Sequence, residues 1–311
     1  LDFEKQVAAL DRKIAELREM GDDPSLNIDG DIARLEDKSS KMLRDIYTKL
    51  TPWQKTQVAR HPDRPHFKHY VAGLFDDWMP LAGDRNFGDD QAILGGLARF
   101  RGRRVMVIGH EKGDDIPSRM KHNFGMAKPE GYRKAIRLMQ LADRFGLPVV
   151  TLVDTSGAFP GIQAEERGQA EAIARATEQC LALGVPMVAA IVGEGGSGGA
   201  IALAAANRVL MFEHAVYSVI SPEGCASILW RTADKAPDAA AAMKMSAQDL
   251  LGLKVIDRIV TEPVGGAHRA PEVAIQSLGD ALAQELDGLQ GQSRERLRTD
   301  REDKFLAMGR A

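Results

Sequence analysis

Apolar residues recur along the first part of the chain at steps of three and four residues, which is the spacing of an amphipathic helix. The positions that carry this spacing in the first helix are Val7, Leu10, Ile14 and Leu17. The pattern predicts helices over residues 3–20, 32–50 and 69–78, with breaks at the glycine and prolines between them. Because such a helical arm is too thin to bury a core alone, we expect it to pack on the rest of the chain or on another subunit.

From about residue 81 the pattern changes to short apolar runs separated by helical stretches. Two runs, over 93–100 and 105–109, predict a pair of strands joined by a turn at 101–103. Further strands are expected over 149–154, 188–192, 209–212, 217–220 and 255–260, and helices over 129–144, 164–183, 198–206, 222–253 and from 271 onward. Alternating strands and helices predict parallel pairing with helices as crossovers, so the fold class is α/β.

The chain divides by pattern into three parts. We assign an N-terminal helix to residues 1–30 and a main domain to 31–290, of which 31–80 is a helical lead-in. The remaining residues, 291–311, form a charged helical tail, which we expect to be a solvated helix face rather than a binding site.

A glycine-rich segment occurs twice, each time directly after an apolar strand. The first copy covers 155–161 and the second covers 193–200, and the two units are offset by about 38 residues, in the range of a repeated supersecondary unit. A helical pattern follows each copy, so unpaired N–H groups at a helix start would point into the loop. Two such loops side by side would present backbone donors to one developing negative oxygen, which is an oxyanion hole.

The second copy also permits a different enzyme. Residues 195–199 match the pattern G-x-S-x-G, in which Ser197 would be the nucleophile of a serine hydrolase, and His268 lies downstream of it. Glycine crowding around Ser197 suits close approach of a backbone better than exposure of one hydroxyl. A third reading is a non-catalytic scaffold that binds acyl-CoA. No P-loop signature follows these glycines, and the Rossmann fingerprint is incomplete.

Composition excludes several partners. Across 311 residues, 41 basic residues face 44 acidic ones, so the net charge of −3 offers no basic field for nucleic acid. We expect no membrane span and no signal peptide. The two cysteines, Cys180 and Cys225, lack metal-site spacing and fit a reducing compartment, so we expect a cytoplasmic protein without a bound metal.

Several stretches together resemble the alpha subunit of the bacterial acetyl-CoA carboxylase carboxyltransferase over essentially the whole chain. These stretches are residues 1–4, 59–62, 81–85, 123–126, 129–135, 164–169, 193–200, 218–230 and 265–269. The chain departs from the family pattern at Ser156, where the family has a proline, but Gly157 is kept.

The resemblance implies a crotonase-like (ClpP/crotonase) superhelix of β-β-α units with an N-terminal helical arm. It implies transfer of a carboxyl group from carboxybiotin to acetyl-CoA, which gives malonyl-CoA in the first committed step of fatty acid synthesis. It also implies partners: a zinc-containing beta subunit in an α2β2 heterotetramer, the biotin carboxyl carrier protein that holds the carboxybiotin, and biotin carboxylase.

In such a mechanism the charge would be stabilised by the backbone rather than by a side-chain nucleophile. The candidate donors are the N–H groups of Gly157 or Ala158 in the first loop and of Gly198 or Gly199 in the second. The remaining residues expected to shape the substrate site are Gly195, Gly196, Ser197, Phe159, Pro160 and Gly161.

Overall fold

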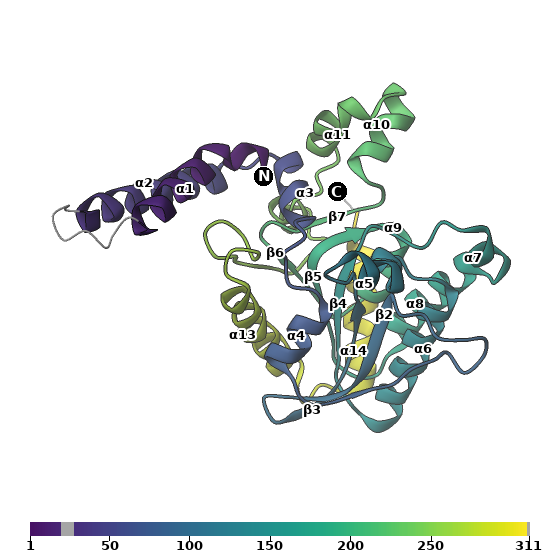
Figure 1. Cartoon of the computed structure of the whole chain (residues 1–311). Helices are drawn as coiled ribbons and strands as arrows, with labels where there is room; N and C mark the ends of the chain where they lie inside the picture. The colour runs from purple at the N-terminus through teal and green to yellow at the C-terminus, as the bar shows by residue number, and fades with distance from the viewer. Residues whose placement is uncertain (20–27, 310–311) are drawn as a thin grey trace.

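The computed structural model describes residues 1–19 and 28–309, and one mixed β-sheet forms the centre of that part (Figure 1). The eight strands lie in the order β1-β2-β3-β4-β5-β6-β8, and β7 pairs with the end of β5. Their bounds are β1 Asp76–Pro80, β2 Ile93–Phe100, β3 Arg103–His110, β4 Val149–Thr155, β5 Met187–Gly196, β6 Arg208–Phe212, β7 Val216–Ser218 and β8 Arg258–Val260. The pairs among β1, β2 and β3 are antiparallel and the rest are parallel, which confirms the predicted strand pair and the parallel sheet.

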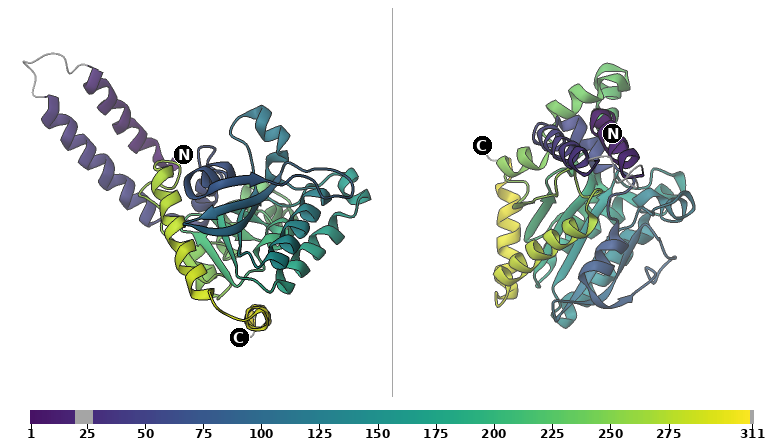
Figure 2. Two further views of the ribbon diagram at one scale, coloured as in Figure 1. Left: turned by 90° about the horizontal axis from the view of Figure 1, so that it is seen from below. Right: turned by 60° about the vertical axis from the view of Figure 1, so that its left-hand side comes forward.

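Helices cover both faces of this sheet. The helices are α1 Lys5–Glu19, α2 Ile28–Thr48, α3 Pro52–Ala59, α4 Phe67–Leu74, α5 Ile116–Lys121, α6 Pro129–Phe145, α7 Ile162–Glu166, α8 Gln169–Ala182, α9 Ser197–Ala204, α10 Pro222–Trp230, α11 Ala236–Ala242, α12 Ala247–Gly252, α13 Pro271–Leu289 and α14 Arg294–Ala307. Helices α6, α8 and α9 pack together on one face, and α4 and α13 pack on the other (Figures 1 and 2). None of the described helices is long and apolar enough to cross a bilayer.

The two central strands, β4 and β5, are buried along their entire length. Helices on both faces exclude water from them, which is why their sequences read as continuous runs of small and apolar residues rather than as an alternation. Both run in the same direction, and their carboxyl ends lie at the same edge of the sheet. The fold therefore brings the two glycine-rich segments to one place.

Helices α1 and α2 form an antiparallel hairpin that extends away from the body (Figures 1 and 2). A small apolar cluster at its base contains Val7, Leu43, Tyr47, Leu50 and Val58. The Tyr47 hydroxyl donates to Glu4 at 2.5 Å, and the Arg269 guanidinium lies 3.5 Å from the same carboxylate. These contacts confirm the predicted packing on the body. The predicted helix end at Met20 and the break at 21–25 lie outside the described residues.

Three predicted helices are wrong in their extent. Trp78 lies in strand β1, not in a helix, because residues 76–80 pair with β2 and the Trp78 ring packs edge-on against Phe67. The helix expected over 164–183 is broken by Gly168, which has φ +79°. The helix expected over 222–253 is divided into α10, α11 and α12, in part because Arg231 adopts the left-handed region at φ +56°.

The charged tail is not simply a solvated face. Helix α14 packs on the body through Leu297 and Arg301, both of which are buried. The Arg301 guanidinium donates to the backbone carbonyls of Leu183 at 2.8 Å and Val185 at 3.2 Å and to the Asn207 amide oxygen at 2.5 Å. Because these acceptors have little access to water, the hydrogen bonds from Arg301 help to satisfy them, together with the Met187 N–H at the Asn207 oxygen.

Replacing this cation tests how firmly α14 is attached. We expect Arg301→Met to lower the free energy of unfolding by about 2–4 kcal/mol, because several buried carbonyls lose their donor. Arg296→Met, on the exposed side of the same helix, removes only an exposed pair with Asp300 and should cost less than about 1 kcal/mol. Urea denaturation of both variants measures the difference, and equal stabilities would contradict this role.

Candidate functional site

The two glycine-rich segments lie against each other at the carboxyl ends of β4 and β5. Thr155 pairs in register with Gly195. A β-carbon on Gly196 would overlap the Ser156 carbonyl oxygen, and one on Gly199 would lie 2.8 Å from the Gly157 carbonyl carbon. Since real side chains do not approach backbone so closely, only glycine allows this contact. The predicted adjacency of the two loops is confirmed.

The second segment does not begin its turn where the sequence predicted. Residues 193–196 continue β5 as extended strand, and the turn falls at Ser197, which has φ +53°. The strand can continue here because its glycines leave room for neighbouring groups: a β-carbon on Gly193 would lie 2.5 Å from a carboxylate oxygen of Asp154. The donors of the second segment therefore belong to the start of α9.

The backbone N–H groups around this contact differ in whether they are already used. The Gly157 N–H donates to the Thr155 hydroxyl at 3.1 Å, so the fold already satisfies it. The Ala158 N–H has no hydrogen-bond partner in the part of the chain that the structure describes. Gly198 and Gly199 lie in the first turn of α9, whose N–H groups have no acceptor within the helix. Of the two candidate donors in the first loop, Ala158 therefore has the free N–H group and Gly157 does not.

A cavity of about 700 Å³ opens beside Ala158 and Ser197, the first residue of α9, whereas Gly198 and Gly199 are not among the residues that line it. Of the residues expected from the sequence, Gly157, Ala158, Phe159, Pro160 and Ser197 line it. Gly195 and Gly196 are buried beneath it and shape the strand end, and Gly161 packs against the Phe159 ring.

Other lining residues were missed by the sequence reasoning: Arg60, Gln169, Ile173, Val219, Ile220 and Glu223. The amide of Gln169 donates to the carbonyl oxygens of Ala127 at 2.8 Å and Phe159 at 3.1 Å, so it holds the first loop in place. Arg60 directly follows α3 and is far from the two loops in the chain. The one signal that included it was the stretch 59–62 within the family resemblance.

Beneath the loops lies a buried polar cluster at the end of β4. The Asp154 carboxylate accepts the Glu194 N–H at 2.9 Å and lies 2.7 Å from the Lys112 ammonium. Burial alone would raise the pKa of Asp154, but Lys112 and His66 outweigh it and hold that pKa below its usual value. His110, fully buried beside this cluster, has its pKa lowered to about 4 by desolvation.

Ser197 lacks the surroundings of a hydrolase nucleophile. Its side chain is exposed and makes no hydrogen bond within the described residues. No histidine lines the cavity that it faces, and His268 stacks instead on His61 with ring centroids 3.9 Å apart. A serine without a base in reach is not activated for attack.

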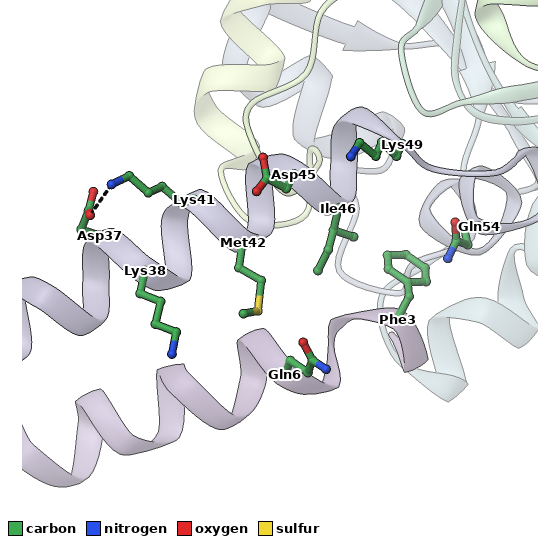
Figure 3. Close-up of a pocket in the computed structure, with 10 residues that line it drawn as sticks. All are labelled: Phe3, Gln6, Asp37, Lys38, Lys41, Met42, Asp45, Ile46, Lys49 and Gln54. Carbon is green, nitrogen blue, oxygen red and sulfur yellow. Dashed lines mark ion pairs between the residues drawn. The ribbon is translucent and has the colours of Figure 1, made fainter.

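Two further features lie outside this site. Across residues 1–19 and 28–309, no cluster of three or more histidine, cysteine or acidic side chains is arranged to hold a metal ion. A larger cavity of about 770 Å³ lies at the base of the arm between α1 and α2, lined by Phe3, Met42, Ile46 and several charged residues (Figure 3). It contains neither of the strand-end loops.

The architecture defines a class, the crotonase-like fold. Among solved structures, a Pseudomonas malonate decarboxylase hetero-tetramer in complex with coenzyme A aligns with a TM-score of 0.56 at 17% identity, over 70% of this chain and 86% of that one. Transcarboxylase 12S aligns with a TM-score of 0.55 at 20% identity, over 68% of this chain and 41% of that one. At these identities the likeness is one of fold.

Sequence narrows the class to one family. The chain belongs to the acetyl co-enzyme A carboxylase carboxyltransferase-like family, whose model matches residues 1–309. It is 90% identical to the acetyl-coenzyme A carboxylase carboxyl transferase subunit alpha of Sphingopyxis alaskensis, over 100% of this chain and 99% of that protein. It is 73% identical to the same subunit of Rhizorhabdus wittichii, over 99% of each.

A methyl group at the loop contact tests whether the site depends on it. We expect Gly196→Ala to lower carboxyltransferase turnover by about 100-fold, because the Ser156 carbonyl must move and a displacement near 1 Å has that scale of effect. Gly288→Ala, in α13, meets no atom within 4 Å and should leave turnover unchanged. Steady-state kinetics of the two variants test this prediction, and equal turnover in both would show that the site does not depend on the loop contact.

Buried His110 predicts how stability depends on pH. Its pKa is near 4 in the folded protein and near 6.5 when unfolded, so only the unfolded chain takes up a proton as the pH falls from about 6.5 to about 4. Between pH 7 and pH 5 this should lower the free energy of unfolding by about 2 kcal/mol. Urea denaturation at both values should show a smaller loss for His110→Gln, whereas the same loss in both proteins would contradict this origin.

Proposed function

We propose that this chain is the alpha subunit of a carboxyltransferase that moves a carboxyl group from carboxybiotin, held on a biotin carboxyl carrier protein, to acetyl-CoA to form malonyl-CoA. The observation that carries the proposal is the pair of unsatisfied N–H groups, at Ala158 and at the start of α9, beside one cavity. The family to which the chain belongs supports the same reaction.

The unsatisfied N–H groups suit a biotin group on which negative charge develops. Carboxybiotin would supply the carboxyl group. The N–H groups of Ala158 and of Gly198 or Gly199 would donate to its ureido oxygen, where negative charge develops as the carboxyl group leaves, and the strand ends hold these donors in place before the reaction begins. Donors aimed at developing charge stabilise the transition state more than the ground state, and losing one costs about 3–4 kcal/mol.

A partner chain would complete the site. Val219, on the rim of the cavity, is 82% exposed, and Ile228, Leu229 and Trp230, which lie at the end of α10 and do not line the cavity, are also exposed. Exposed apolar groups of this extent favour a protein interface. We propose that a zinc-containing beta subunit covers this rim in an α2β2 heterotetramer, that biotin carboxylase carboxylates the carrier, and that the assembly works in the cytoplasm, where the free Cys180 and Cys225 stay reduced.

Reconstitution tests the function directly. The chain would be co-expressed with a candidate beta subunit, and malonyl-CoA would be measured after addition of carboxylated carrier protein and acetyl-CoA. We expect malonyl-CoA only when both subunits are present. Absence of product from a stable, purified complex would overturn the proposal.

A substitution at Ser197 distinguishes carboxyl transfer from serine hydrolysis. We expect Ser197→Ala to keep malonyl-CoA formation within about threefold of the unmodified protein, because the side chain makes no hydrogen bond and an exposed change of this size is worth about 0.5 kcal/mol. A fluorophosphonate probe should leave the protein unlabelled. Labelling that disappears in Ser197→Ala would instead establish a serine hydrolase.

A further inference from the structure

Arg60, the residue that follows α3, connects two walls of the cavity. Its guanidinium donates to one oxygen of Glu194 through Nε at 2.9 Å and Nη2 at 2.7 Å. The other nitrogen, Nη1, donates to Glu223 at 2.5 Å. Glu194 lies in the glycine-rich end of β5 and Glu223 in the first turn of α10, so one cation joins the strand that carries the second loop to the helix that faces it.

The same network continues beneath the first loop. The pairing of β4 with β5 shifts between Val153 and Thr155, and at that shift the Asp154 carboxylate accepts the Glu194 N–H at 2.9 Å in place of a regular ladder bond. The Lys112 ammonium lies 2.7 Å from Asp154 and 3.8 Å from Glu194. Glu194 is therefore held by its backbone from one side and by its side chain from the other.

Arg60 directs most of its donors at these two carboxylates. Its guanidinium carries five N–H donors and makes four hydrogen bonds to Glu194 or Glu223, whose two negative charges exceed its single positive charge. The Glu194 side chain is only 9% exposed, so removal of Arg60 would leave a nearly buried carboxylate with one remaining cation, Lys112, at a longer distance. Arg60 therefore acts chiefly through the two carboxylates that it holds in place.

We propose that Arg60 is a positioning residue for carboxyl transfer: through Glu194 and Glu223 it sets where the second loop lies relative to the first and to α10. This inference rests on the proposed function. The role that it assigns to the ion-pair network of Lys112, Asp154, Glu194, Arg60 and Glu223 is to hold the loops in position.

The test compares Arg60 variants in the reconstituted complex. We expect Arg60→Met to lower kcat by about 100-fold while KM for acetyl-CoA changes by less than about threefold, because the donors lose alignment and the acyl-CoA contacts do not. Arg60→Lys, which keeps the charge but cannot bind both carboxylates, should retain about a tenth of kcat. Arg103→Met is the matched control, since Arg103 is 29% exposed against 30% for Arg60 and pairs with Asp287 at 2.5 Å.

Glu223→Gln is a second test that does not depend on whether Arg60→Met folds. Glu223 is 36% exposed, so we expect the protein to remain folded and kcat to fall about tenfold. Adding this change to Arg60→Met should cause little further loss, because both remove the same link. Unchanged kcat in Glu223→Gln, or effects that multiply in the double variant, would overturn the proposal.

Amide hydrogen exchange separates this inference from the proposed function, since it requires no reaction. Peptides covering residues 156–161 and 193–200 should exchange at least about tenfold faster in Arg60→Met than in the unmodified protein, and at the original rate in Arg103→Met. If the unmodified complex made no malonyl-CoA but the exchange rates changed in this way, the function would be wrong and the network right. If exchange stayed unchanged while the unmodified complex was active, the network would be wrong.

Discussion

The contact between two backbones at the ends of β4 and β5 is the constraint on which the rest of the site depends. A β-carbon at Gly196 or Gly199 would collide with the first loop, so both positions must be glycine for the strand ends to meet. Once they meet, Ala158 of the first loop and Ser197 at the start of α9 line one cavity. The buried strands, the crossover helices and Gln169 all hold that contact.

Charge is placed around this contact rather than in it. Asp154, Glu194 and Lys112 are buried or nearly so beneath the loops, and burial of unpaired charges would be strongly unfavourable. Their pairing, completed by Arg60, gives a rigid base without exposing a competing nucleophile or base to the substrate. The donors themselves remain neutral amides, which suits an oxygen whose charge develops only during the reaction.

Local sequence pattern was sufficient for the strands other than β1, and it predicted the adjacency of the loops because a repeated unit places equivalent segments side by side. It failed where tertiary contacts decide: residues 193–196 look like a turn but continue β5, and neighbours such as Asp154 beside Gly193 and Ser156 beside Gly196 take the space that side chains would fill. Local pattern could not identify Arg60 for a similar reason, because its partner Glu194 lies 134 residues later in the chain. Only the three-dimensional structure shows which N–H groups are free, because the Thr155 hydroxyl accepts a hydrogen bond from Gly157 and none from Ala158.

A site built from backbone donors has a consequence for assembly. Amides at strand ends are fixed by the sheet, but they are few and lie on one side of the cavity, so they can hold one oxygen and leave the other reactant unbound. Val219, exposed on the rim of the cavity, and Trp230, exposed at the end of α10, are apolar side chains that favour contact with another protein. If backbone donors alone stabilise the charge, as proposed, a second polypeptide is the natural source of the remaining contacts.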